Sequence, residues 1–243
     1  MGNTDIANHF FIAGATRGFS GLGFTMVALP FSAHYVPVTV LVPILMLLEL
    51  IGNGQMYPKI KRDVDWPWLT ALIVPTVLFT ALGVYLLKVL DQEYVVFAIN
   101  VFILFSVIWI NIGFTFKHHP GIKGHLMFGS VAGIMNGVAA MSGPSVSTYA
   151  LALGMPMHVI RASLIMFFIL ADGIGFGFTV VNGLVSLNAV YLALLFYFPS
   201  LLGNKLGERL FLRFGNEKGK PFIIFLLGII SLTSIVQFLF ALI

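Results

Sequence analysis

Three charged side chains lie within long apolar stretches of this chain: Arg17, Glu49 and Asp172. A charge surrounded by apolar sequence is costly to bury, so it usually serves a function and faces a cavity. The guanidinium group of Arg17 presents a planar fork of donors that matches a tetrahedral oxyanion. Glu49 and Asp172 are candidate proton carriers or counter-ions, because burial favours the neutral form of a carboxyl group.

Each of these charges also has a purely structural interpretation. Arg17 could extend to the membrane surface, or pair with Asp5 or Glu49. Glu49 could be a static partner of Arg17, and Asp172 could cap or pack beside Gly173. The sequence leaves both interpretations open for all three residues.

Two short stretches combine glycine and serine in a way that should break a helix. Residues 17–23 read Arg-Gly-Phe-Ser-Gly-Leu-Gly, and residues 141–145 read Met-Ser-Gly-Pro-Ser. Half-helices that begin near Ser20 and Ser142 would present free N–H groups and partial positive charge, which suit an anion. Glycine allows the backbone to approach a ligand closely, although the same glycines could serve only helix packing.

Composition places the chain in a membrane. Of its 243 residues, 59% are hydrophobic and 9% are charged, against about 25% charged residues in a soluble globular protein. Apolar stretches near the roughly 20 residues of a membrane-spanning helix recur along the chain. The net charge of +4 fits cytoplasmic loops and gives no reason to expect nucleic acid. Cysteine is absent, which excludes disulfides and thiolate chemistry.

An internal repeat organises these features. Ala13-Gly14-x3-Gly18 recurs as Ala132-Gly133-x3-Gly137, and the same offset pairs Arg17 with Asn136. It also pairs Pro37 with Pro156 and Asn53 with Asp172, while Pro75-x7-Gly83 recurs as Pro199-x7-Gly207 after a small insertion. We expect a first transmembrane repeat over residues 1–118 and a second over residues 119–243, in one integral membrane domain.

Charge counting predicts how the repeats cross the membrane. Segments 36–57, 66–87, 94–116, 158–181, 187–204 and 221–242 each fit one span, whereas 4–34 and 122–155 are either kinked full spans or re-entrant hairpins. Hairpins leave only Lys88 opposite the other loop cations, with Arg17 inside the membrane. The positive-inside rule favours this model. It predicts an all-α polytopic protein of two inverted repeats, each a broken or re-entrant segment plus three transmembrane helices, with both termini extracytoplasmic.

These arguments give two sets of candidate residues. The candidate substrate-binding residues are Arg17, Gly18, Ser20, Gly21, Asn136, Ser142, Gly143 and Ser145. The candidates for coupling transport to an ion are Glu49, Asp172 and Asn53. The pair His118-His119 lacks a neighbouring carboxylate, so we expect no metal site and no cofactor.

The glycine-rich breaks resemble those of the sulfite exporter TauE/SafE family of membrane transporters. The resemblance lies in residues 14–23 with Pro30, in residues 133–144, and in the Pro-x3-Gly-x3-Gly segment that starts at Pro199. It implies a protein of the bacterial inner membrane that moves sulfite or an organosulfonate such as isethionate, sulfoacetate or taurine.

The sequence therefore predicts a secondary transporter for a small sulfur-containing anion that works by alternating access. Its expected partners are this anion and the lipid bilayer, with homodimer formation left open. A passive anion channel is the first alternative. An intramembrane serine protease is the second, because Gly18-Phe19-Ser20-Gly21 matches a G-x-S-G motif, but no histidine lies in the middle of a predicted span to activate the serine. We expect no enzymatic activity.

Overall fold

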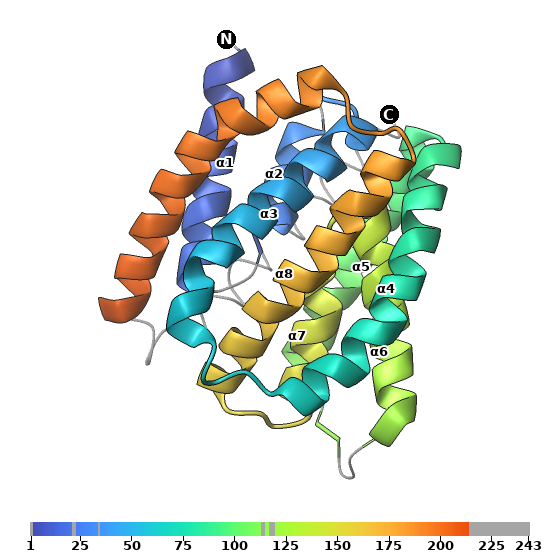
Figure 1. The fold of residues 1–243 in the computed structure, drawn as a ribbon, viewed down its shortest axis with the longest axis vertical. Coiled ribbons are helices and arrows are strands. Elements are labelled where there is room, and N and C mark those ends of the chain that lie inside the picture. The colour runs from blue at the N-terminus through green and yellow to red at the C-terminus, as the bar shows by residue number, and fades with distance from the viewer. Residues whose placement is uncertain (1, 21–22, 34, 113–114, 117–119, 214–243) are drawn as a thin grey trace.

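A computed structural model describes residues 2–20, 23–33, 35–112, 115–116 and 120–213. Its regular elements are all helices within this part of the chain, which confirms the all-α membrane fold (Figure 1). They are α1 (Gly2–Ser20), α2 (Phe24–Ser32), α3 (Val38–Ile60), α4 (Trp66–Val89), α5 (Gln92–Ile112), α6 (Gly121–Ala139), α7 (Gly143–Ala152), α8 (Met157–Val181) and a last helix, Leu187–Arg213. The predicted span 221–242 lies outside the described residues.

The helix bounds repeat along the chain. Helices α1, α2 and α3 begin at residues 2, 24 and 38, and α6, α7 and α8 begin at residues 121, 143 and 157. Each start is thus displaced by the same 119 residues that separate the repeated sequence motifs. At 1.5 Å per residue, α2 and α7 extend about 15 Å, or half of a hydrocarbon core of about 30 Å. Both are therefore half-helices.

Local sequence explains where the helices start. Pro37 and Pro156 occupy the N-cap positions of α3 and α8, where the missing N–H of proline costs nothing. Asp65 caps α4, since its Oδ1 accepts a hydrogen bond from the backbone N–H of Trp68 at 3.1 Å. In each half of the chain, a proline thus directly precedes the first helix that is long and apolar enough to cross a membrane.

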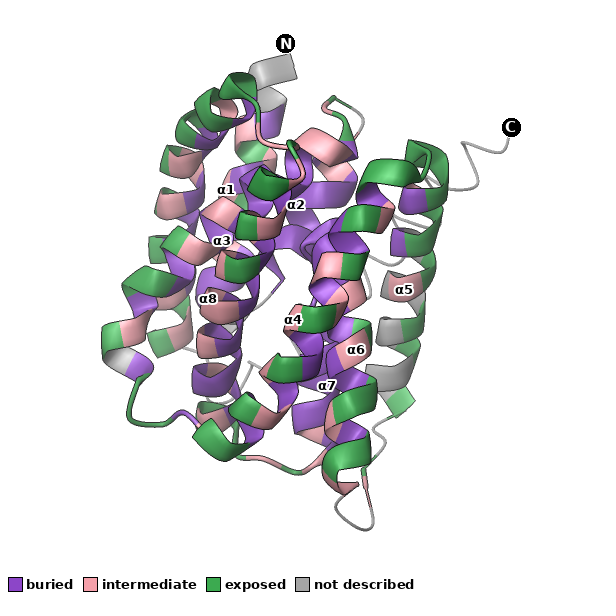
Figure 2. Cartoon of the chain, turned by 45° about the vertical axis from the view of Figure 1, so that its right-hand side comes forward, coloured by how far each residue is buried: buried purple, intermediate pink, exposed green. Residues whose placement is uncertain are grey.

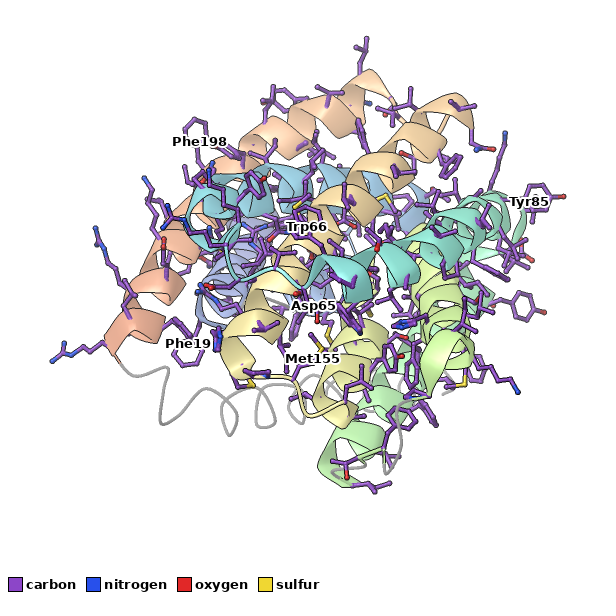
Figure 3. The ribbon with its side chains drawn as sticks, turned by 60° about the horizontal axis from the view of Figure 1, so that its bottom comes forward. Phe19, Asp65, Trp66, Tyr85, Met155 and Phe198 are labelled. Atoms are coloured by element: carbon purple, nitrogen blue, oxygen red, sulfur yellow. The ribbon has the colours of Figure 1, made fainter. Side chains whose placement is uncertain are left out.

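Four of the described helices are long and apolar enough to cross a membrane: Val38–Pro58, Trp66–Val89, Met157–Val181 and Leu187–Arg213. Buried residues lie on the helix faces that turn toward the middle of the molecule, and exposed ones lie on the outer faces (Figure 2). The outer faces are themselves apolar. Tyr85 and Phe198, for example, are 56% and 68% exposed and point outward in Figure 3. Such an apolar exterior suits lipid contact.

One predicted boundary is wrong. The segment 187–204 is expected to be one span, but the helix that starts at Leu187 continues beyond residue 204 to Arg213. The apolar window ends at Asn204-Lys205, but the next turns still have a partner, since Gly207 packs against the backbone of α1 at Ala15. Packing, and not hydropathy, thus sets the length of this helix.

Two glycine-lined contacts join the halves of the chain. In the first, Gly133 and Gly137 of α6 lie directly against the Thr76 and Thr80 carbonyl oxygens of α4. The second contact joins α1 to the Leu187–Arg213 helix, where Gly14 and Gly18 meet the carbonyl oxygens of Ser200 and Asn204. On the facing side, Gly203 and Gly207 meet the carbonyl oxygens of Phe11 and Ala15. Small residues of this kind let membrane helices pack backbone to backbone.

Adding one methyl group at the first contact should destabilise the protein. The Cβ atom in Gly133→Ala would overlap the Thr76 carbonyl oxygen, which belongs to the backbone and cannot rotate away. Overpacking of this kind costs about 1–3 kcal/mol. We expect a lower melting temperature for the purified protein in detergent. The matched control is Gly177→Ala in α8, where nothing lies within 4 Å of the added Cβ, so an equal loss of stability in both variants would contradict the packing argument.

Candidate functional site

The first helix break lies between α1 and α2. Helix α1 ends at Ser20, and α2 begins at Phe24 with Gly23 as its N-cap. Gly23 has φ +91°, a left-handed conformation that glycine adopts without strain. The free end of α2 binds a carboxylate of the chain itself: Glu49 Oε1 accepts hydrogen bonds from the Thr25 backbone N–H at 3.1 Å and from Thr25 Oγ1 at 2.7 Å.

The second break lies between α6 and α7 and has a different environment. Ala140 follows α6 with φ 52°, and Ser142 is the N-cap of α7. The Ser142 hydroxyl is buried and has no hydrogen-bond partner among the described residues. Position 168 of the second half corresponds to Glu49, but it holds a phenylalanine, whose ring contacts the position where a Cβ of Gly143 would stand. The position that corresponds to Glu49 therefore offers no carboxylate to the N-terminus of α7.

Both breaks border the same small cavity. Gly23, Thr25 and Met26 line it from the first break, and Ala140, Met141 and Gly143 line it from the second. Glu49 of α3 and Phe168 of α8 complete the lining. The cavity measures about 10 Å³, which is room for one water molecule and too small for a sulfonate group. Residues far apart in the sequence thus meet near the midpoints of α3 and α8.

Arg17 lies beside the first break, inside the last turn of α1. It is 2% exposed, and its Nη1 donates a hydrogen bond to the Leu48 carbonyl oxygen at 3.1 Å. Its guanidinium group stacks over the Phe24 ring, 4.7 Å from the ring centroid, and packs tightly against Gly52. Arg17 therefore adds a full positive charge next to the N-terminus of α2.

Glu49 and Asp172 form a buried carboxyl pair. They are 6% and 1% exposed, and they interact with each other and with the charge of Arg17. Neither oxygen of Asp172 receives a hydrogen bond from a donor among the described side chains and backbone groups. Two ionised carboxylates cannot hydrogen-bond to one another, so a hydrogen bond within this pair would require a proton on one of the two groups.

Two buried asparagines lie on α3 and α6. Asn136, the repeat partner of Arg17, donates a hydrogen bond from Nδ2 to the Ala171 carbonyl oxygen at 3.1 Å, while its Oδ1 has no partner in the described part of the chain. Asn53, the repeat partner of Asp172, is fully buried, and neither its Nδ2 nor its Oδ1 has a described partner. Unsatisfied amides in a core call for an explanation, and a ligand or a second conformation supplies one.

The family model for "Sulfite exporter TauE/SafE" matches residues 7–234, which is nearly the whole chain. The chain belongs to the TauE/SafE family. This is a family of membrane transporters, which agrees with the resemblance and with the apolar helices. Comparison with curated proteins and comparison with solved structures each gave no match.

The structure revises where some predicted residues of this TauE/SafE protein lie. Arg17 and Asn136 are within the last turns of α1 and α6, and not within the breaks. Ser20 is the last residue of α1 and does not begin a half-helix, because α2 begins only at Phe24, directly after the left-handed Gly23. Gly21 lies outside the described residues. The starts of α2 and α7 at residues 24 and 143 are thus the real half-helix N-termini.

Two other candidates make structural contacts. Gly18 packs against the Asn204 backbone, so its missing side chain serves the contact between α1 and the last described helix. Ser145 donates from Oγ to the Phe128 carbonyl oxygen at 3.0 Å, which ties α7 to α6. Of the remaining candidates, Gly143 lines the cavity, and Ser142 is the N-cap of α7.

Sequence reasoning missed Thr25 and Phe168. Thr25 holds Glu49 through two hydrogen bonds, and Phe168 closes the cavity on the side of α7. The repeat offset contained a signal for Phe168, because it pairs this residue with Glu49 and so marks a difference between the halves. Thr25 carried the weaker signal of a hydroxyl just after a glycine-rich break.

Proposed function

We propose that this TauE/SafE protein is a secondary transporter for a small sulfur-containing anion, sulfite or an organosulfonate. The observation that carries the proposal is the meeting of both helix breaks at one buried cavity, beside Arg17 and the N-terminus of α2. Arg17 would hold the anionic head electrostatically. The N-termini of α2 and α7, with the free hydroxyl of Ser142, would supply hydrogen-bond donors. The family description names sulfite export and supports this class of substrate.

The proposed mechanism is alternating access. A cavity of about 10 Å³ cannot admit a sulfonate, so the breaks must separate for the substrate to enter. The two glycine-lined contacts leave no space for sliding, and the pairs α4–α6 and α1 with the last described helix would therefore move as units. Half-helices between such units are the usual position of a transport site. In our proposal, opening alternates between the two membrane faces around this fixed site.

We further propose that the halves of the chain are inverted relative to each other. The connections 61–65 and 153–156 lie at the same end of the molecule, and the N-terminus lies at the other (Figure 1). The first connection follows α3, whereas the second precedes α8, which corresponds to α3 in the second half. Because α3 ends and α8 begins at the same end of the molecule, these two helices run in opposite directions. The end with these connections carries Lys61 and Arg62 and would face the cytoplasm of a bacterium. Lys88, at the other end, donates to the Asn182 carbonyl oxygen at 3.1 Å and so stabilises the end of α8.

Counterflow in proteoliposomes tests this function. Vesicles that contain the purified protein are loaded with unlabelled isethionate, diluted and given a trace of labelled isethionate outside. A transporter accumulates the label transiently, because the excess of unlabelled internal isethionate competes for the inward-facing sites and so keeps the labelled molecules from leaving. Sulfite and sulfoacetate serve as competitors, and acetate tests the preference for sulfur. Saturable counterflow supports the proposal, whereas linear, non-competed flux would show a channel. Labelling of Ser20 by a fluorophosphonate would instead revive the protease interpretation.

A further inference from the structure

The N-terminus of α2 already binds an anion that belongs to the protein. The Glu49 carboxylate accepts both the backbone N–H and the hydroxyl of Thr25, at the end of the half-helix that Arg17 borders. These donors are the ones that a substrate oxyanion would use. The substrate and the ionised form of Glu49 therefore need the same position.

The charges buried at this site determine how a substrate anion can replace the Glu49 carboxylate at the N-terminus of α2. Among the described residues, the charged or titratable groups whose charges interact at this site are Arg17, Glu49 and Asp172, from α1, α3 and α8. From the second break the cavity is lined by Ala140, Met141 and Gly143, which do not titrate. With one proton on the pair of carboxyl groups, Arg17, Glu49 and Asp172 together hold one positive and one negative charge. A second buried negative charge without a partner would be costly.

We infer that Glu49 is a built-in competitor for the substrate, and that a small oxyanion binds at α2 only as Glu49 takes up a proton. The step balances: one monoanion enters, the Glu49 carboxylate leaves Thr25, and one proton from the water at the open face binds to that carboxylate. The buried charge is unchanged. Anion and proton then cross together, so transport of a monoanion is electroneutral symport with one proton. This inference rests on the proposed function and deepens it.

The asymmetry of the repeat supports this assignment. The second half has Phe168 where the first has Glu49, so the equivalent position of the second half has no carboxylate to exchange for an anion. The Ser142 hydroxyl at the start of α7 is buried without a described partner. A substrate can therefore accept a hydrogen bond from this hydroxyl without displacing a described side chain, in contrast to the Thr25 donors that Glu49 occupies. One half-helix thus supplies the proton-linked position, and the other supplies a free donor.

Isethionate binding at different pH values tests the inference. Its sulfonate stays ionised over the pH range 6–8, so any pH dependence belongs to the protein. Uptake of one proton on binding means that the affinity rises about tenfold for each unit by which the pH falls. Thermal stabilisation of the purified protein at increasing isethionate concentration gives the affinity at each pH. Glu49→Gln keeps an acceptor for Thr25 without charge or titration, so we expect its affinity to be independent of pH and at least as high as the wild-type value at pH 6.

Two further variants complete the experiment. Glu93→Gln removes an exposed carboxylate in the first turn of α5 and should keep the wild-type pH dependence. Should Glu49→Gln fail to fold, Glu49→Asp shortens the side chain away from Thr25, and we expect its affinity at pH 8 to rise toward the value at pH 6. In proteoliposomes, a pH gradient should drive isethionate accumulation by the wild-type protein but not by Glu49→Gln, which should retain exchange.

The outcomes separate this inference from the proposed function. Binding or counterflow without any dependence on pH would overturn proton-linked competition and leave the transporter proposal intact. The same holds if Glu49→Gln keeps the full wild-type pH dependence. Absence of isethionate binding and of counterflow in the wild-type protein at every pH, with sulfite and sulfoacetate equally inactive, would overturn both proposals.

Discussion

The Arg17→Met variant is expected to lose transport and to unfold well below the wild-type temperature. Methionine retains much of the length of arginine, so the stacking on Phe24 and the packing against Gly52 are largely kept. What disappears is the positive charge opposite the buried carboxyl pair and the hydrogen bond to the Leu48 carbonyl oxygen. Removing one partner of a buried charged group leaves the other uncompensated, at a cost of about 3 kcal/mol or more.

A double variant separates folding from function at this position. Arg17→Met combined with Glu49→Gln removes both charges, and most of the lost stability should return while isethionate counterflow remains absent. Lys61→Met, at the exposed end of α3, controls for loss of a cation without burial. Thermal unfolding in detergent and counterflow in proteoliposomes are the two measurements. Wild-type counterflow by the single variant would contradict a substrate role for Arg17, and equal stability of the single and double variants would contradict the charge argument.

The second large effect is expected at Asn53, where stability and activity should change in opposite directions. Both polar atoms of this fully buried amide lack a partner in the described part of the chain. An unsatisfied buried group costs about 1–3 kcal/mol, so Asn53→Leu should melt at a higher temperature than the wild-type protein. The same replacement removes a polar group one turn from Glu49, and we expect isethionate counterflow to fall at least about tenfold, the size of effect that a lost interaction of about 1.4 kcal/mol produces.

Asn188→Leu is the matched control for this prediction, because Asn188 is exposed near the start of the last described helix. It should change neither counterflow nor stability by much. Lower stability of Asn53→Leu would mean that the amide has a structural partner. Higher stability with unchanged counterflow would mean that Asn53 takes no part in the transport cycle. Natural proteins commonly retain such a destabilising group where function needs it.

Much of this architecture was predictable from sequence, for identifiable reasons. Apolar segments near 20 residues indicate membrane helices whatever their partners. The repeated glycine motifs located both helix breaks and paired Arg17 with Asn136. The charges of Glu49 and Asp172 within apolar stretches mark them as candidates, and the structure buries both side chains. These signals are local in the sequence, or depend on a fixed offset, and so they need no knowledge of packing.

What sequence could not supply depends on contacts between distant segments. A glycine in a helix looks the same whether it faces a ligand or another backbone, and only the approach of Asn204 shows that Gly18 packs. The hydrogen bonds from Thr25 to Glu49 depend on how α2 lies against α3. Hydropathy likewise could not extend the last described helix to Arg213, because that extension depends on α1. Local patterns in the sequence thus indicate which residues are candidates for the site, whereas tertiary packing determines which of them lie together.

The glycine-lined contacts also determine when the helices can pack together during synthesis of the protein. Each contact pairs a helix of the first half with one of the second, α4 with α6 and α1 with the Leu187–Arg213 helix. A ribosome that has completed only the first half has therefore inserted two backbone-lined surfaces whose partners do not yet exist. Those surfaces stay in lipid until the second half is made, and α1 waits until Gly203 and Gly207 have been translated. A protein whose halves are interlocked in this way completes its assembly only near the end of synthesis, and its halves, if severed, should depend on each other for folding.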